Sequence, residues 1–443
     1  MIVMKFGGTS VGSSESIEKV LDIISSESRN KIIVLSAFSG VTNLLVEINN
    51  QYEKGGENIP LLLVQLQEKC LLVVNPLFKT AAFLLVAQNF IALKINEIRS
   101  LLQLPFNEES TRKIIAQGEF ISTNIFQFFL QDNKFQSSLI SALDFMSLNK
   151  NNEPTVPLIS KKIISCMKET PSHTYITQGF ICMNYDKQIS NLERGGSDYT
   201  ASLIGAAIDA EEIQIWTDID GMHNNDPRYV DNTFSLEEIS FDEAAELAYF
   251  GAKILHPQSL YPAKEKNIPV RLKNTFHPEK KGTIIKNFTV NKGVASIAAK
   301  DGITAIKIKS YRMLLAYGFL KQVFEVFETY QTPIDMITTS EVAVSLTIDN
   351  NKYLSEIKNS LQEFGTVDVD TGLSIVCVAG NFSQNKEGIS TRVFDALKHI
   401  PIRMISYGGS NYNISLLVKT SHKSAALNAL NDHLFKTKKE VLV

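Results

Sequence analysis

The first ten residues, Met1–Ser10 with the sequence MIVMKFGGTS, decide the fold that we expect for this chain. Residues 2–6 are mostly apolar and predict a short buried strand, which Gly7-Gly8 end sharply. Thr9 and Ser10 are predicted to cap a helix whose apolar residues follow at helical spacing. A strand, a glycine turn and a helix N-terminus favour an anion site, because backbone N–H groups and the helix dipole converge there.

Lys5 directly precedes these glycines and would add a full positive charge to the predicted anion site. The pattern differs from a Walker loop, where the lysine follows the glycines, and from the GxGxxG of dinucleotide-binding folds. An ordinary strand–helix turn with a surface lysine is the alternative that this stretch alone leaves open.

Composition excludes several classes of protein. The 443 residues are enough for two or three domains, and 44% apolar with 21% charged residues is typical of a soluble globular protein. A net charge of -3 predicts no nucleic-acid partner. The longest uninterrupted apolar run of the most apolar region, Ala81–Ala87, is far shorter than the roughly 20 residues of a membrane span. Four scattered cysteines fit neither a metal site nor a disulfide framework, so we expect a reduced, cytoplasmic protein.

The strand–turn–helix pattern of the first residues recurs along the first half of the chain. Residues 31–35 (KIIVL) predict a second strand before a small-residue turn, and residues 212–217 (EIQIWT) predict another before the acidic turn 218–222. These repeats indicate an α/β fold. In such open sheets, ligands bind at the carboxyl ends of the strands.

Three stretches carry candidate functional groups. Glu119 follows a glycine inside a helix predicted over residues 110–129, where it is either solvated or faces a cavity. Residues 193–201 (ERGGSDYTA) place an arginine, two glycines, a hydroxyl and a carboxylate within five positions, which exceeds what helix capping requires. Lys253, in GAKILHP (251–257), is a third candidate, whereas His256 beside a proline is predicted to be structural.

The second half of the chain contains an internal repeat. Gly318-Phe319 recurs about seventy positions later as Gly388-Ile389, and Ser345-Leu346 recurs as Ser415-Leu416. Each unit reads as a helix with an apolar stripe, a strand and a hairpin partner. Two such α+β units suggest a ligand-binding or dimerisation module. Neither contains a nucleophile–base arrangement, so we expect the chemistry in the first half.

Four stretches in this order and spacing resemble the aspartokinases: KFGGTS (5–10), RGGSDYTA (194–201), TDIDGMHNNDPR (217–228) and GAKILHP (251–257). Residues 318–320, 335–341 (DMITTSE) and 407–413 resemble the tandem ACT repeats that follow the kinase domain in that family. The resemblance covers essentially the whole chain. It is to the monofunctional, lysine-regulated class, without a homoserine dehydrogenase extension.

The resemblance implies an amino-acid-kinase (carbamate-kinase-like) fold over residues 1–287. Two α+β ACT domains (ferredoxin-like) would follow over residues 293–443, with repeats at about 303–372 and 373–443. The implied reaction transfers the ATP γ-phosphate to the β-carboxylate of L-aspartate, giving 4-phospho-L-aspartate, the first step of lysine, threonine and methionine biosynthesis. That carboxylate is ionised at neutral pH and needs no general base. The site must therefore position the reactants and neutralise charge on the phosphoryl group.

The resemblance also assigns roles to residues. Lys5 and Asp198 would be catalytic, with Lys5 neutralising phosphoryl charge and Asp198 holding Lys5 and the metal-bound phosphates. Arg194 would clamp the α-carboxylate of aspartate and Glu119 would receive its ammonium. The rest of the aspartate pocket would be Ser36, Ala37, Thr42, Phe180 and Ser197. The nucleotide site would comprise Lys5, Gly7, Gly8, Thr217, Asp218, His223, Arg228 and Lys253. Mg²⁺ would arrive with ATP on phosphate oxygens and water, without a dedicated protein site.

An effector site is implied in the second half. It would comprise Met313, Ala316, Gly318, Phe319, Leu320, Asp335, Thr339 and Ser340. Asp335 would bind an effector ammonium, and lysine is the predicted inhibitor. Ala316 stands where the lysine-regulated class tends to have serine, so threonine or no effector remain alternatives.

Two further departures concern the nucleotide pocket. His223 stands where the family usually has tyrosine or phenylalanine, and Asn224-Asn225 replace small hydroxyl residues. We expect a homodimer through the ACT domains, with a tetramer as the alternative. Another carboxylate kinase of this fold (acetylglutamate, glutamate or carbamate type) and a catalytically dead amino-acid sensor are the competing functions. Arg194 with Glu119 favours a substrate that has both an ammonium and an α-carboxylate.

Overall fold

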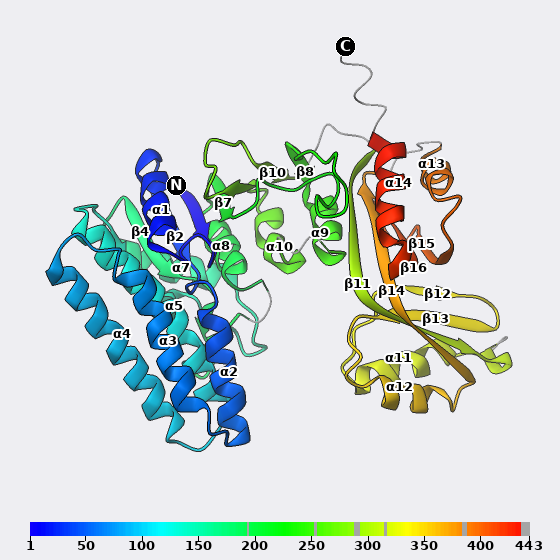
Figure 1. Cartoon of the computed structure of the whole chain (residues 1–443), viewed down its shortest axis with the longest axis horizontal. Coiled ribbons are helices and arrows are strands. Elements are labelled where there is room, and N and C mark those ends of the chain that lie inside the picture. The colour runs from blue at the N-terminus through cyan, green and yellow to red at the C-terminus, as the bar shows by residue number, and fades with distance from the viewer. Residues whose placement is uncertain (193–194, 252–254, 288–292, 314–316, 383–387, 436–443) are drawn as a thin grey trace, which may run out of the picture. The chain divides into compact units, whose positions relative to one another are not determined.

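The computed structural model describes residues 1–192, 195–251, 255–287, 293–313, 317–382 and 388–435, which form two compact units (Figure 1). The first unit comprises Met1–Met222, Glu237–Phe241 and Leu255–Phe288, and the second comprises His223–Leu236, Asp242–Ile254 and Thr289–Val443. The division predicted from the sequence placed residues 223–236 and 242–254 in the first domain. In the structure, residues 223–236 and 242–251 group with the second unit.

The first unit is built on a sheet with the strand order β3-β4-β2-β1-β7-β9-β10-β8 among the described residues. Its strands are β1 (Ile2–Phe6), β2 (Lys31–Leu35), β3 (Ser138–Leu139), β4 (Thr174–Gln178), β7 (Glu212–Thr217), β8 (Glu238–Ser240), β9 (Val270–Asn274) and β10 (Thr283–Lys286). Strands from β3 to β9 in this order pair in parallel, whereas β10 is antiparallel to β9. A small hairpin of β5 (Ile181–Met183) and β6 (Ile189–Asn191) lies apart from this sheet. The predicted α/β fold is confirmed.

Helices cover both faces of this sheet. They are α1 (Ser14–Ser26), α2 (Val41–Lys54), α3 (Ile59–Val74), α4 (Ala81–Leu102), α5 (Glu108–Asp132), α6 (Ala142–Phe145), α7 (Val156–Glu169), α8 (Gly196–Ala207) and α10 (Pro257–Glu265). Ile2, Met4 and Phe6 of β1 join the core formed with α1–α5. Successive strand residues face opposite sides, so Lys5 faces the other side, where α8 contacts β1.

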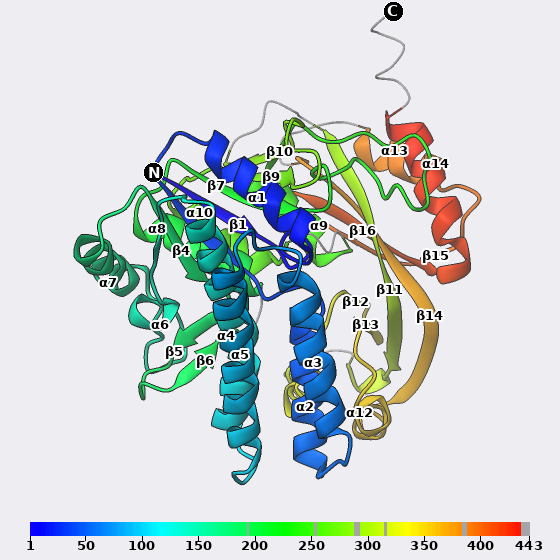
Figure 2. The ribbon, with the colours of Figure 1, turned by 60° about the vertical axis from the view of Figure 1, so that its left-hand side comes forward.

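Helices α2 to α5 form a bundle in which each helix packs on the next and α2 also packs on α5 (Figures 1 and 2). Within the described chain, α4 is the one helix long and apolar enough to cross a membrane by length and composition. Its buried residues Ala87, Ile91, Ile95 and Ile98 face the bundle. A helix of a bundle passes the same test, so α4 is weak evidence for a span.

The predicted caps of α1, Thr9 and Ser10, are wrong. A turn at residues 8–11 precedes the helix, and a Cβ on the next residue, Gly12, would lie only 2.9 Å from the Ser39 Cβ, which shows how tightly this segment packs. The helix therefore begins later, with Ser13 as its N-cap in a capping box with Ser16. The Ser10 hydroxyl instead lies 2.7 Å from the Thr275 hydroxyl, just after β9.

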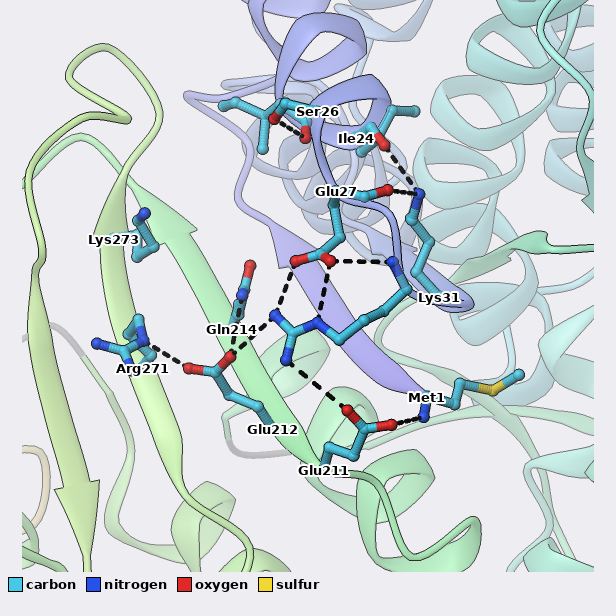
Figure 3. A network of polar contacts seen from close by, with 12 residues as sticks. Met1, Ile24, Ser26, Glu27, Lys31, Glu211, Glu212, Gln214, Arg271 and Lys273 are labelled. Atoms are coloured by element: carbon cyan, nitrogen blue, oxygen red, sulfur yellow. Dashed lines mark hydrogen bonds and ion pairs between the residues drawn. The ribbon is translucent and has the colours of Figure 1, made fainter.

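A polar network joins the amino ends of β1, β2 and β7 (Figure 3). Arg29 pairs with Glu27 at 2.7 Å and with Glu212 at 3.4 Å, and Glu212 also pairs with Arg271. Lys31 donates to the carbonyl oxygens of Ile24 and Glu27 at the end of α1, and burial lowers the pKa of its ammonium. The network therefore holds the amino ends of these strands together, at the edge of the sheet away from their carboxyl ends.

The second unit contains an antiparallel sheet with the strand order β12-β13-β11-β14-β16-β15 in its described part. Its strands are β11 (Val294–Lys309), β12 (Ile337–Thr339), β13 (Ala343–Ile348), β14 (Thr366–Gly380), β15 (Ile402–Tyr407) and β16 (Asn413–Lys419). Its helices are α9 (Phe241–Tyr249, of which Phe241 belongs to the first unit), α11 (Phe319–Thr329), α12 (Leu354–Leu361), α13 (Ile389–Ala396) and α14 (Lys423–Phe435), with short 3-10 turns at Tyr311–Met313 and Thr420–His422.

The repeat in the sequence corresponds to a structural repeat. Helices α11 and α13 each begin after a glycine with a left-handed backbone, Gly318 with φ 84° and Gly388 with φ 87°. Glycine adopts this conformation without the cost that a Cβ imposes. Each helix packs in its own apolar core, one with β13 and the other with β16. The two predicted α+β units are confirmed.

The segment 223–236 is fastened to α14 through buried amides. The Asn224 side chain donates to the Asn431 oxygen at 3.0 Å and accepts from the Phe234 backbone N–H at 2.7 Å. The Asn225 side chain donates to the Leu427 carbonyl at 3.1 Å. These two departures from the family pattern thus have structural partners within the second unit.

Replacing Asn431 by alanine is expected to lower the free energy of unfolding by about 1–3 kcal/mol, because it leaves the buried Asn224 amide without its partner. Urea unfolding measures the loss, and hydrogen exchange should rise over residues 223–236. Ser424→Ala is the matched control, because Ser424 is an exposed residue of the same helix; we expect less than about 0.5 kcal/mol. Equal losses in both variants would contradict the buried anchor.

Candidate functional site

The predicted site residues of the first unit gather at one edge of its sheet. Gly7 follows β1, Ser36 follows β2, Gly179 follows β4 and Thr217 ends β7. These strands are adjacent in the order β4-β2-β1-β7 and parallel, so their carboxyl ends share one edge. This edge is where open α/β sheets bind ligands.

Lys5 and Asp198 form an ion pair across this edge. The Lys5 Nζ lies 2.7 Å from the Asp198 Oδ1, and the two side chains are only 11% and 16% exposed. Asp198 lies in the first turn of α8, which begins after Gly195 with φ 76°. Lys5 points to the face of β1 that carries α8. The structure therefore brings together two charged groups nearly two hundred positions apart in the chain.

The glycine turn after β1 packs closely on its neighbours. The Gly7 N–H donates to the Trp216 carbonyl at 3.1 Å and is therefore not free to bind an anion. A Cβ on Gly7 would lie 3.6 Å from the Lys5 Nζ, and one on Gly8 would lie 3.1 Å from the Ala37 carbonyl oxygen. The absence of side chains here lets the turn approach both Lys5 and the loop after β2.

The loop after β2 meets the start of α8. The Ser36 hydroxyl donates to the Ser197 hydroxyl at 2.9 Å. A Cβ on Gly179 would lie 2.3 Å from the Ser197 Oγ, so no other residue fits at that position. Phe180 has a left-handed backbone with φ 65°, and its N–H donates to the Thr200 hydroxyl at 2.9 Å. Three predicted aspartate-pocket residues thus lie together.

Glu119 is buried in α5, with only 3% of the residue exposed. Among the described residues its Oε2 has no hydrogen-bond partner, and burial raises the pKa of the carboxyl to about 8 although backbone hydrogen bonds from Glu119 and Ala37 oppose the shift. A Cβ on Gly118 would lie 2.9 Å from the Ala37 Cβ, so this glycine lets α5 approach the loop after β2. The solvated alternative for Glu119 is wrong.

Two residues beyond the predicted set, Gln178 and Thr123, form a buried hydrogen-bonded chain that ends on the Glu119 backbone carbonyl. The Gln178 side chain accepts from the Ala142 N–H at 2.8 Å and donates to the Thr123 hydroxyl at 2.9 Å. The Thr123 hydroxyl donates to the Glu119 carbonyl at 2.7 Å. A polar residue ending the buried strand TYITQ was the available signal, since a buried amide needs partners.

The predicted nucleotide residues are divided between the two units. In the first unit, the Thr217 hydroxyl donates to Asp218 at 3.1 Å, and Asn274 donates to the Asp218 carbonyl at 3.3 Å. His223 and Arg228 belong to the second unit, where Arg228 pairs with Asp226 at 2.7 Å and is largely exposed. Thr42 of the aspartate set is half-buried in the first turn of α2. Arg194, Lys253 and the effector residue Ala316 lie outside the described residues.

The predicted effector residues lie in the second unit. Phe319 packs in the α11 core with Met313 at its edge, whereas Leu320, Thr339 and Ser340 are exposed. The Asp335 side chain is only 2% exposed and pairs with Lys300. The described chain has no cluster of three or more His, Cys, Asp or Glu suited to a metal ion.

Comparisons with known proteins identify the family. Residues 1–274 match the amino acid kinase family, and residues 376–434 match an ACT domain. Aspartokinase 1, chloroplastic, of Arabidopsis thaliana is 34% identical over 98% of this chain and 80% of its own length. The lysine-sensitive aspartokinase 3 of Escherichia coli K12 is 32% identical over 98% of this chain and 99% of its own. The chain belongs to the aspartokinase family.

Solved aspartokinases share the fold. E. coli aspartokinase III in complex with aspartate and ADP matches with a TM-score of 0.85 at 32% identity, over 98% of this chain and all of that one. The complex of the same enzyme with lysine and aspartate matches with a TM-score of 0.83. The predicted family, fold and activity are confirmed, and this aspartokinase is an aspartate kinase.

Proposed function

We propose that the Lys5–Asp198 pair is the centre at which this aspartokinase transfers the ATP γ-phosphoryl group to the β-carboxylate of L-aspartate, and that L-lysine inhibits it. The pair's distance of 2.7 Å at the carboxyl ends of the central strands is the observation that supports this most directly. A phosphoryl transfer needs positive charge on the transferring group rather than a nucleophile of the protein.

Lys5 would stabilise the transferring phosphoryl group. Asp198 holds its ammonium in place before the reactants bind, so little reorganisation is needed when charge develops. Both side chains are mostly buried, which strengthens their electrostatic interactions relative to water. The β-carboxylate of the substrate is ionised at neutral pH and attacks without a general base.

The aspartate pocket would lie between α5 and the start of α8. Ser36, Ser197 and Phe180 would line the α8 side, and Arg194 would pair with the substrate α-carboxylate. Glu119 would receive the substrate ammonium. Burial keeps this carboxyl largely protonated when no cation is near, and a bound ammonium would favour its ionised form.

Within the first unit, the nucleotide site would comprise Gly7, Gly8, Thr217 and Asp218. The turn after β1 would bring backbone N–H groups beyond Gly7 toward the phosphates, beside the Lys5 ammonium. Mg²⁺ would enter with ATP, coordinated by phosphate oxygens and water, and it would neutralise phosphate charge. No residue of this chain is assigned to it as a ligand.

An assay for acyl phosphate, trapped as the hydroxamate, tests the assignment of substrate. Aspartate with ATP should give product, whereas glutamate, N-acetylglutamate and carbamate should give little. Preference for one of the other acceptors, or no turnover of any, would overturn the proposal in favour of a related carboxylate kinase or an inactive sensor.

We expect lysine at millimolar concentration to inhibit the enzyme and to raise its melting temperature, because a ligand that binds only the folded state stabilises it. At a hundred times its Kd, such a ligand contributes about 2.7 kcal/mol. Support comes from the lysine-sensitive E. coli relative and from the carboxylate of Asp335. A titration measures both effects, with threonine as the parallel ligand. Lysine without either effect would refute the proposed effector.

The second unit would also form the homodimer contact, with a tetramer as the alternative, in a cytoplasmic enzyme. Light scattering of the full chain with and without lysine distinguishes these oligomeric states. A monomer under all conditions would exclude both.

A further inference from the structure

Lys300 is enclosed by acidic and aromatic side chains of the second unit. Its Nζ lies 2.9 Å from the Asp335 Oδ1 and 2.8 Å from the Asp349 Oδ2. The Tyr249 ring lies over it at 4.6 Å, and the Tyr249 hydroxyl donates to the same Asp335 oxygen at 2.9 Å. Two carboxylates and an aromatic face form a binding site for an ammonium group, and a lysine of the chain fills it.

Asp335 is the most buried of the three charged side chains at this site. The side chain of Asp335 is 2% exposed, against 21% for Lys300 and 38% for Asp349. Burial raises the pKa of the Asp335 carboxyl, although Lys300 and Tyr249 oppose the shift. Burial alone would lower the pKa of Lys300, but its hydrogen bonds to Asp349 and Asp335 outweigh burial and raise it. The ammonium of Lys300 is therefore charged where it meets the more buried carboxylate.

We propose that Lys300 competes within the chain for Asp335: its ammonium occupies this carboxylate in the effector-free protein, and an amino-acid effector binds there by displacing it. The inference rests on the proposed function, which makes Asp335 the partner of an effector ammonium. The Asp335 Oδ1 already accepts from both Lys300 and Tyr249, so an incoming ammonium competes with them for this oxygen. Two ammonium groups at one carboxylate would also repel each other.

Asp349 gives the displaced lysine an alternative partner. It already pairs with Lys300 and is more exposed than Asp335, so Lys300 can keep one ion pair while its ammonium regains water. Breaking the Lys300–Asp335 pair costs free energy, and this cost weakens the binding of the effector. The same holds for any protein in which only a fraction of the molecules can bind the ligand. Lys300 thus sets the concentration range in which the effector acts.

The same contacts reach the end of α9. Tyr249 is the last residue of α9, and a Cβ on Gly251 would lie 2.0 Å from the Ala299 carbonyl oxygen, next to Lys300. Displacement of Lys300 removes the cation beneath the Tyr249 ring and changes the environment of its hydroxyl. Gly251 therefore lies close to the strand that carries the exchanging ammonium.

The variant Lys300→Gln tests this competition. Removing the internal ammonium should lower the half-inhibitory lysine concentration by about tenfold, and calorimetry should show the same decrease in the Kd for lysine. A change of this size is typical of the coupling between two binding sites in one protein. Activity without lysine should stay unchanged. Lys309→Gln is the matched control on the same strand, because Lys309 forms an exposed pair with Asp368 at 3.5 Å; it should respond like the wild type.

Further variants make the result decisive. Lys300→Arg keeps the charge and can bind Asp335 through two hydrogen bonds, so it should raise the half-inhibitory concentration, and it remains informative if Lys300→Gln folds poorly. Unchanged or weaker lysine binding by Lys300→Gln, with a wild type that lysine inhibits, overturns the competition alone. A wild type that binds no lysine overturns the proposed effector as well. Asp335→Asn should abolish lysine binding, whereas retained binding would refute the role of Asp335.

Discussion

Replacement of Lys5 by alanine is expected to lower kcat by about a hundredfold to a thousandfold, the cost of removing one preorganised charge donor from a transition state. The KM for aspartate should change little, because Lys5 would contact the phosphoryl group rather than the amino acid. The expectation follows from the Lys5–Asp198 ion pair of 2.7 Å and the low exposure of both side chains. A loss confined to kcat indicates an interaction made in the transition state.

Steady-state kinetics with saturating ATP and aspartate measure this effect, and circular dichroism checks that the variant is folded. Lys54→Ala is the control, since Lys54 is an exposed lysine at the end of α2 and should leave kcat unchanged. Asp198→Asn should also lower kcat, and its effect should not add to that of Lys5→Ala, because the two residues act as a unit. If Lys5→Ala retains kcat within a factor of about three, Lys5 has no part in the transfer.

The pairing of Lys5 with Asp198 was implied by the family resemblance, and local patterns account for the side of β1 that Lys5 faces. The alternation of IVMKF places Lys5 opposite Met4 and Phe6, and α8 covers that face. The strands at 2–6, 31–35 and 212–217 and the α+β repeat followed from periodicity and glycine turns in the same way. These features depend on residues close together in the sequence, so they can be predicted from the sequence alone.

Other features depend on partners that are distant in the sequence. Asn224 and Asn225 are buried only because α14 presents Asn431 and a carbonyl two hundred residues later. The enclosure of Lys300 likewise requires four segments of the second unit.

Glu119→Gln is expected to stabilise the ligand-free protein above neutral pH while it weakens aspartate binding. The pKa of the Glu119 carboxyl is about 8 in the folded protein, against an ordinary value of 4.5. Between these values the folded state binds more protons than the unfolded state, so the unfolding free energy falls as pH rises and levels off above about 8. At about 1.4 kcal/mol per pKa unit, the loss is on the order of 3–5 kcal/mol. Glutamine does not titrate and removes this decline.

Urea unfolding at about pH 6 and pH 8.5 measures the change in pH dependence, with Glu108→Gln, an exposed carboxylate of the same helix, as the control. The KM for aspartate should rise about tenfold to a hundredfold in Glu119→Gln, since a neutral amide replaces the partner of an ammonium. A pH profile identical to the wild type would show that Glu119 does not titrate as its burial implies. If Glu119→Gln raises the free energy of unfolding and also weakens aspartate binding, Glu119 is a carboxylate that serves substrate binding at a cost in stability.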